Sequence, residues 1–165
     1  MDYSTFDEVL VDYQAEVYCF ALHLTRDRAE ANALYQETLL TAFHAFNERD
    51  RPANERTWLF TILTDAFLSD RLGHGAGSSS GEEQAADGGT SPVQTDRLDA
   101  HTLRREVEAC VTTLPGPQWV ALVQRRYLNR EYAEIAETLR CSEVAARASV
   151  YEALRAMRAH VGHRL

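Results

Sequence analysis

Apolar residues recur every three or four positions through the first part of the chain. This spacing gathers side chains on one face of an α-helix, and it predicts one long or two abutting amphipathic helices before residue 25. The apolar positions of this stripe are Phe6, Val9, Leu10, Tyr13, Val17, Phe20, Ala21 and Leu24. An amphipathic helix buries its stripe against another element, so further helices are expected to pack on it.

Two more helices are predicted before residue 72. Asp27 and Glu30 have the D-x-x-E form of a capping box, which satisfies backbone N–H groups at the start of a helix. Pro52 ends this helix, and another opens near Glu55. The apolar positions of the two helices are Leu34, Leu39, Leu40, Phe43 and Phe46, and then Trp58, Leu59, Ile62, Leu63, Ala66 and Phe67. We therefore predict a bundle of three or four helices.

A second set of helices follows residue 100. The apolar spacing predicts one helix that ends at Pro115 and a further helix after Pro117. Residues 132–139 then predict a short helix, and residues 143–160 predict a longer one with Ser142 as its N-cap. Because only three residues separate these two helices, the pattern is that of a helix-turn-helix.

The segment between the two sets has a different composition. Residues 73–95 are rich in Gly, Ser and acidic residues and almost lack large apolar side chains, which is typical of a flexible linker. No stretch of the sequence alternates apolar and polar residues over the length of a strand. We therefore predict an all-α protein with two small helical bundles, at residues 1–72 and 101–165, joined by a flexible acidic linker at residues 73–100.

Charge is distributed unevenly among these three parts. The chain has 165 residues and a net charge of −8, which argues against a general nucleic-acid-binding protein. By part, the net charge is −7 for residues 1–72, −4 for residues 73–100 and +3 for residues 101–165. Only the C-terminal part, which contains the predicted helix-turn-helix, carries the positive charge that suits contact with DNA phosphates.

The sequence offers no constellation for catalysis or metal binding. Its three cysteines, Cys19, Cys110 and Cys141, lie far apart, and its six histidines show no metal-ligand spacing. No nucleophile is paired with a base. The chain also lacks a secretory signal and any apolar run near the roughly 18 residues of a membrane span. We expect a cytoplasmic protein that enters no membrane, is not an enzyme, and uses no metal or cofactor.

Three separate motifs resemble the extracytoplasmic-function (ECF) group of the sigma-70 family of RNA polymerase sigma factors. Residues 34–43, LYQETLLTAF, are similar to the family's polymerase-contacting helix, and residues 56–62, RTWLFTI, are similar to the start of its −10 helix. Residues 132–139, YAEIAETL, follow Leu114-Pro115 and are similar to the family's −35 domain. The motifs occur in the family's order, and this combination is far more specific than a helix-turn-helix alone.

The resemblance implies a sigma factor that binds bacterial core RNA polymerase and directs it to promoter DNA. The N-terminal bundle would bind the polymerase, and the linker would pass through clefts of the enzyme. The residues implied for polymerase contact are Leu34, Gln36, Glu37 and Leu40. The alternative for this face is an ordinary solvated helix surface, on which Glu and Gln are common.

The resemblance also implies two DNA-binding regions. Candidates for the unpaired −10 strand are Arg56, Trp58, Phe60, Asp65 and Arg71, although the aromatic residues share the predicted core stripe and could instead be buried. Candidates for the −35 duplex are Arg147, Ser149, Tyr151, Arg155 and Arg158.

Two acidic residues depart from the family pattern and support a second hypothesis. Asp65 stands where the family often has Asn for base capture, and Glu152 replaces a basic residue of the recognition helix. A carboxylate repels phosphate at either position. The alternative is therefore a sigma-like regulator that keeps its protein-binding faces but does not read promoters.

Whether an anti-sigma factor is a further partner stays open. The resemblance would place such a partner in an apolar groove between the domains.

Overall fold

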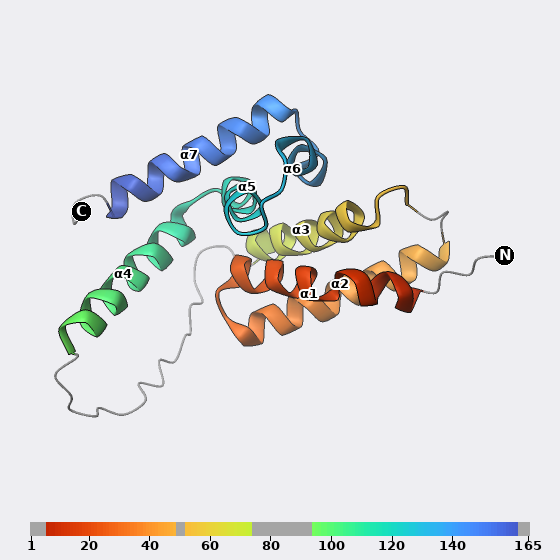
Figure 1. Ribbon diagram of the computed structural model, residues 1–165, viewed down its shortest axis with the longest axis horizontal. Coiled ribbons are helices and arrows are strands. Elements are labelled where there is room, and N and C mark those ends of the chain that lie inside the picture. The colour runs from red at the N-terminus through yellow and green to blue at the C-terminus, as the bar shows by residue number, and fades with distance from the viewer. Residues whose placement is uncertain (1–5, 49–51, 74–93, 162–165) are drawn as a thin grey trace.

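The computed structural model describes residues 6–48, 52–73 and 94–161. These ranges contain seven α-helices and no strand (Figure 1), which confirms the predicted all-α fold. The helices are α1 (Phe6–Thr25), α2 (Arg28–Glu48), α3 (Glu55–Gly73), α4 (Gln94–Thr113), α5 (Gly116–Arg126), α6 (Tyr132–Leu139) and α7 (Glu143–Val161). Most of the predicted linker, residues 74–93, lies outside the described residues.

The N-terminal bundle consists of α1, α2 and α3, whose apolar stripes meet in its core. Phe20 of α1 and Phe60 of α3 are completely buried, with ring centroids 5.0 Å apart. The first stripe forms one continuous helix of 20 residues. Asp27 Oδ1 accepts a hydrogen bond from the backbone N–H of Glu30 at 3.0 Å, so it caps α2 as the sequence predicts.

The C-terminal bundle consists of α4 to α7, and its last two helices form the predicted helix-turn-helix. Glu131 and Glu134 form a reciprocal capping box at the start of α6. The turn begins at Arg140, whose left-handed backbone (φ 52°) ends α6. Ser142 Oγ then accepts the N–H of Ala145 at 3.1 Å, which confirms Ser142 as the N-cap of α7.

Helix α4 is longer than its apolar spacing indicates. It begins at Gln94 and therefore includes residues 94–100, which the sequence places in the linker. The apolar side chains of its last turns, Cys110 and Val111, are buried, whereas Leu103 is exposed. The C-terminal end of α4 is thus anchored by buried apolar contacts.

The two bundles also pack directly against each other. Helices α5 and α6 contact α3, and α5 contacts α1 as well. In Figure 1, α5 and α6 lie on one side of α3 and are seen nearly end-on, with α1 and α2 on its other side. The presence of two helical bundles confirms the prediction. The contact between the bundles is not indicated by the spacing of apolar residues within each helix.

Candidate polymerase and nucleic-acid interfaces

The predicted polymerase-binding residues lie on α2, and three of the four are exposed. Gln36 and Glu37 face solvent, and Leu40 is 63% exposed. Phe43, one turn beyond Leu40, is 46% exposed. Leu34 is only 3% exposed, so it belongs to the core and can contribute only by supporting the helix. The exposed face combines polar groups with two large apolar side chains, as protein-binding surfaces do.

Four of the five predicted duplex-reading residues share one face of α7. Arg147, Tyr151, Arg155 and Arg158 are all exposed, and their spacing of four, four and three residues aligns them along the helix. Ser149 lies off this row and is half-buried. The second helix of a helix-turn-helix thus carries a row of three guanidinium groups and one phenol ring, a composition suited to phosphates and base edges.

Arg147 is held in place by neighbouring side chains. Its Nη2 atom lies 3.4 Å from Glu143 Oε1, and its guanidinium carbon lies 4.8 Å from the centre of the Tyr132 ring. These contacts direct the side chain near the N-terminal end of α7, the end that reads bases in helix-turn-helix proteins. Glu152 is also exposed on α7, so the carboxylate noted in the sequence does face solvent.

The predicted −10 residues on α3 are mostly occupied by contacts within the protein. Phe60 is completely buried, as the core alternative requires. Trp58 is half-buried, with its ring centroid 6.3 Å from that of Phe46. Arg56 donates from Nε to Glu16 Oε2 at 2.6 Å. In this arrangement, α3 therefore presents neither an open aromatic platform nor an uncommitted Arg56 to a nucleic acid.

Arg71, near the end of α3, reaches across to the C-terminal bundle. Its Nη2 donates to the backbone carbonyls of Val111 and Leu114 at 2.7 and 2.6 Å, and to that of Thr112 at 3.2 Å. A cation is favourable at the carbonyl end of a helix, where the helix dipole is negative. Partial burial lowers the pKa of the Arg71 guanidinium. Arg71, a residue of the N-terminal bundle, thus caps the C-terminal end of α4 in the other bundle.

Asp65 also has a partner in the other bundle. Arg140 donates from Nη1 and Nη2 to the two carboxylate oxygens of Asp65, at 2.8 and 2.9 Å. This is the parallel two-bond geometry in which Arg and carboxylate pair most favourably. The hydrogen bonds and charge of Asp65 raise the pKa of Arg140. The acidic residue that departs from the family pattern is therefore neutralised by the turn of the helix-turn-helix.

Arg130, which joins α5 to α6, is buried between the bundles. Its side chain is fully inaccessible to solvent, and its Nη2 donates to Thr57 Oγ1 of α3 at 2.7 Å. Its guanidinium carbon lies 4.5 Å from the centre of the Phe60 ring. Burial lowers the pKa of Arg130, while the nearby charge of Glu134 acts in the opposite direction. A guanidinium this deeply buried requires these partners, because transfer of a charged group from water to the protein interior is strongly unfavourable unless hydrogen bonds and opposite charges compensate it.

The contact between α1 and α5 is formed by two aromatic residues of the C-terminal bundle. Trp119 is buried and donates from Nε1 to the carbonyl of Leu24 at 3.0 Å. Tyr127 stacks on His23, with ring centroids 4.3 Å apart and an interplanar angle of 16°. Burial, and then the charge of Arg26, lower the pKa of His23. Together with the contacts of Arg71, Arg130 and Arg140, these contacts fix the C-terminal bundle on the N-terminal one.

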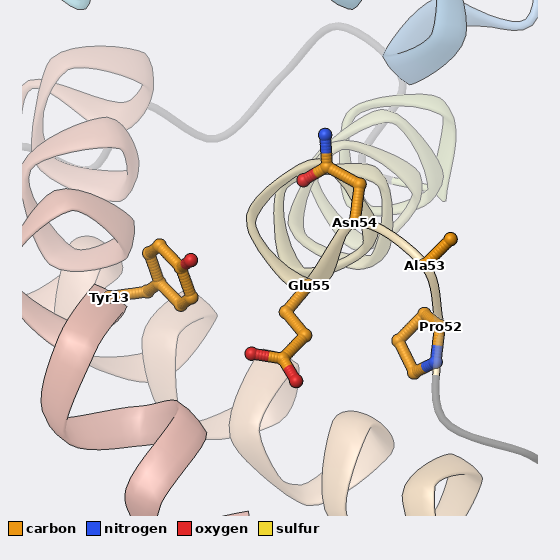
Figure 2. A pocket seen from close by; sticks show the side chains of 5 residues that line it. All are labelled: Tyr13, Pro52, Ala53, Asn54 and Glu55. Carbon is orange, nitrogen blue, oxygen red and sulfur yellow. The ribbon is translucent and has the colours of Figure 1, made fainter.

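An open pocket at the start of α3 is unrelated to these surfaces. It is lined by Tyr13, Pro52, Ala53, Asn54 and Glu55. Figure 2 shows the Tyr13 ring and the Glu55 carboxylate facing one another across it, while the Asn54 amide points away from both. Without a basic side chain among these residues, the pocket is unsuited to nucleic-acid phosphate.

Within the described ranges, no three His, Cys, Asp or Glu residues are grouped closely enough to hold a metal ion. No described helix combines the length and apolar character that a membrane span requires.

Comparison with known proteins places this geometry in a family. A model of sigma-70 region 2 matches residues 10–75, and a model of sigma-70 region 4 matches residues 104–157. The ECF RNA polymerase sigma factor SigL of Mycobacterium tuberculosis is 27% identical over 151 residues, which cover 89% of this chain and 83% of SigL. The ECF RNA polymerase sigma factor EcfG of Rhodopseudomonas palustris is 31% identical over 129 residues, covering 74% of this chain and 66% of EcfG.

A solved structure shares the arrangement of helices. It is the sigma factor RpoE from Bartonella quintana in complex with the anti-sigma factor NepR, with a TM-score of 0.67 and 20% identity over 97% of this chain and 98% of that one. The fold is therefore that of a two-domain sigma factor. The chain belongs to the ECF group of the sigma-70 family, and it is an RNA polymerase sigma factor of that type.

Most of the residues that join the bundles were not among the candidates named from the sequence; Asp65 and Arg71 were named, but as DNA-binding residues. Thr57 and Trp119 lie in helices that the apolar spacing identifies, and Arg130 and Arg140 lie next to such helices, but nothing in that spacing indicates that they meet residues of the other bundle. The one available signal was Asp65, an acidic residue at an unexpected position, and it did not reveal its partner. Contacts between residues so far apart in sequence have no local signature.

Proposed function

We propose that this sigma factor binds bacterial core RNA polymerase through the exposed face of α2 and directs it to promoters through α3 and α7. The observation that carries the proposal is the match to both region 2 and region 4 in one chain. Exposed side chains of suitable chemistry at the predicted polymerase and duplex faces support it. Promoter DNA and core polymerase are then its partners.

The α2 face suits docking on a basic protein surface. Glu37 supplies a negative charge, Gln36 can both donate and accept hydrogen bonds, and Leu40 and Phe43 offer apolar area. Charge complementarity of this kind speeds encounter and fixes orientation, while the apolar side chains add binding energy when they leave water.

The docking proposal is tested by combining Gln36→Ala with Glu37→Arg. Both residues are exposed, so the helices should remain intact, as far-ultraviolet circular dichroism can verify. We expect binding to purified core polymerase to weaken by about tenfold or more, because the variant places a cation on the docking face. Asp12→Arg, an equal charge reversal at an exposed site of α1, is the matched control and should bind normally. Equal binding by all three proteins would remove the α2 face from the proposal.

The α7 row suits reading of a promoter duplex. Arg147, near the start of α7, is placed to reach base edges, and Arg155 and Arg158, farther along, are placed to contact phosphates. Phosphate contacts orient the helix, and base contacts distinguish sequences. Unpaired −10 DNA would then be captured at α3 by the half-buried Trp58 and by Arg56, which would exchange its contact with Glu16 for a phosphate, whereas Phe60 stays in the core.

The chemistry stays with the polymerase in this proposal. The sigma factor contributes binding and orientation, has no catalytic residue or cofactor of its own, and acts in the cytoplasm, where the transcription machinery works.

The second candidate function is that of a sigma-like regulator that does not read promoters. It is favoured by the exposed carboxylate of Glu152 on α7, which would repel DNA phosphates. Transcription from a promoter separates the two.

A further inference from the structure

We propose that Val144 is a specificity-determining residue of α7, and that it contacts the C5-methyl group of a thymine in the promoter duplex. This thymine would lie within about two base pairs of the base that Arg147 reads. The inference rests on the proposed duplex reading by α7, and it adds to that function a further residue and the feature of the base that this residue recognises.

The side chain of Val144 takes no part in the core. Val144 is the second residue of α7 and is 79% exposed, whereas the buried residues of this helix are Ala146, Val150 and Ala153. A β-branched residue is also a weaker helix former than alanine, so Val144 does not favour the helix itself. Its apolar surface is therefore available to a partner.

Val144 extends the α7 row by one position towards the N-terminal end of the helix. It lies three residues before Arg147 and seven before Tyr151, and these spacings bring side chains to the same face of a helix. With about 100° per residue, the extended row falls within an arc of about 80°. The exposed valine thus faces the same partner as the three guanidinium groups of the row, whose charge favours the phosphates of a duplex.

The chemistry of Val144 restricts what it can recognise on a base. Its side chain has no hydrogen-bond donor or acceptor, so it can distinguish bases only by apolar contact. On the base edges of the major groove, the apolar feature is the C5-methyl group of thymine. The N-terminal residues of a recognition helix are those that reach base edges. The position and the chemistry of Val144 therefore point to the same target.

The position of Arg147 indicates which base pair is concerned. Tyr132 and Glu143 hold its guanidinium near the N-terminal end of α7, at 4.8 Å from the ring centre and 3.4 Å from Oε1. Val144 precedes Arg147 by about 4.5 Å along the helix axis. Successive base pairs are about 3.4 Å apart. We therefore expect the thymine one or two base pairs away from the base that Arg147 contacts.

The test uses holoenzyme reconstituted from the full chain and core polymerase. The holoenzyme first selects its preferred duplex from a library of random sequence. Each thymine of that duplex is then replaced singly by deoxyuridine, which keeps the base pair and removes only the methyl group. We expect the affinity to fall about fourfold at one thymine near the position that Arg147→Ala relaxes, the effect of losing one buried methyl group. The Val144→Ala protein should bind thymine and uracil equally there.

Val11→Ala is the matched control, because Val11 is 69% exposed on α1. Both substitutions replace an exposed valine with a better helix former, so both proteins should fold, as circular dichroism can verify. The control should discriminate thymine from uracil as the wild type does. At the same position, 5-methylcytosine should bind more tightly than cytosine to the wild type and the control, and equally tightly to Val144→Ala.

The outcomes separate the role of Val144 from the function on which it rests. Equal binding of thymine and uracil by the wild type, or a preferred duplex without a thymine near the Arg147 position, would refute that role and leave duplex reading by α7 intact. Weaker binding of every duplex alike by Val144→Ala would indicate another contact and refute it too. If Arg147→Ala also leaves the sequence preference unchanged, duplex reading by α7 fails, and the role of Val144 fails with it.

Discussion

At the scale of single residues, Arg130 has the most demanding position in the protein. It is charged, fully buried, and bonded to side chains of both bundles. The amide nitrogen of its neighbour Gln124 is buried without a hydrogen-bond partner in the described structure. The side-chain acceptors of Arg130 are Thr57 Oγ1 at 2.7 Å and Glu134 Oε2 and Gln124 Oε1 at 3.4 Å each, so loss of the nearest one should be measurable.

We predict that Thr57→Val destabilises the folded protein by about 1–3 kcal/mol, the typical effect of leaving a buried donor unsatisfied. Thr61→Val is the matched change on the same helix, since its hydroxyl bonds only a carbonyl of α3, and it should alter stability by less than about 1 kcal/mol. Urea denaturation followed by circular dichroism measures both. Equal effects of the two substitutions would mean that the Thr57 hydroxyl contributes nothing specific to holding Arg130.

The lowered pKa of His23 predicts that the stability of the folded protein depends on pH. Because burial and the charge of Arg26 lower its pKa below the ordinary value of 6.5, the unfolded chain binds more protons than the folded one once the pH falls below about that value. Stability should therefore fall from pH 7 towards pH 5.5 and should be insensitive to this residue above pH 7.5.

His23→Phe tests this directly, since it keeps an aromatic ring against Tyr127 and removes the titrating group. We expect the melting temperature of this variant to change less between pH 7.5 and 5.5 than that of the wild type. His101→Phe, at an exposed site of α4, should retain the wild-type pH dependence. If His23→Phe retained it too, other groups would be responsible.

At the scale of helices, the sequence predicted most boundaries because local chemistry sets them. Asp27 and Ser142 cap the helices that follow them, and Pro115 separates α4 from α5. The start of α4 was missed because residues 94–100 follow a Gly- and Ser-rich segment and offer no clear apolar stripe. Apolar periodicity marks the part of a helix that packs and says little about a part that extends beyond the core.

The α7 row predicts different effects for two of its arginines. Arg147→Ala should lose about 1–3 kcal/mol of promoter binding and relax one base position if Arg147 reads a guanine. Arg155→Ala should weaken all sequences alike and reduce the number of released counterions by about one. Competition binding of polymerase holoenzyme to promoter variants at several salt concentrations measures both. If neither substitution has an effect, α7 does not read DNA, which is what the sigma-like regulator hypothesis requires.

At the scale of the whole molecule, the sequence predicted two helical bundles, but not the way in which the two bundles pack against each other. The α2 face and the α7 row were candidates because the sequence motifs in these helices resemble those of the sigma-70 family, and each set of residues lies within a single helix. The contact of Trp119 with the Leu24 carbonyl, or of Arg71 with the end of α4, joins distant residues through a backbone atom. Such contacts depend on the final placement of helices, and no local pattern of side chains reports them.

The central claim, that this chain acts as a sigma factor, is tested most directly by run-off transcription with purified core RNA polymerase on a library of genomic promoter fragments. We predict defined transcripts that require the added chain, that weaken with the Gln36→Ala and Glu37→Arg protein, and that persist with Asp12→Arg. Core polymerase that produces the same transcripts with and without the chain on every fragment, although the chain binds it, would contradict the claim.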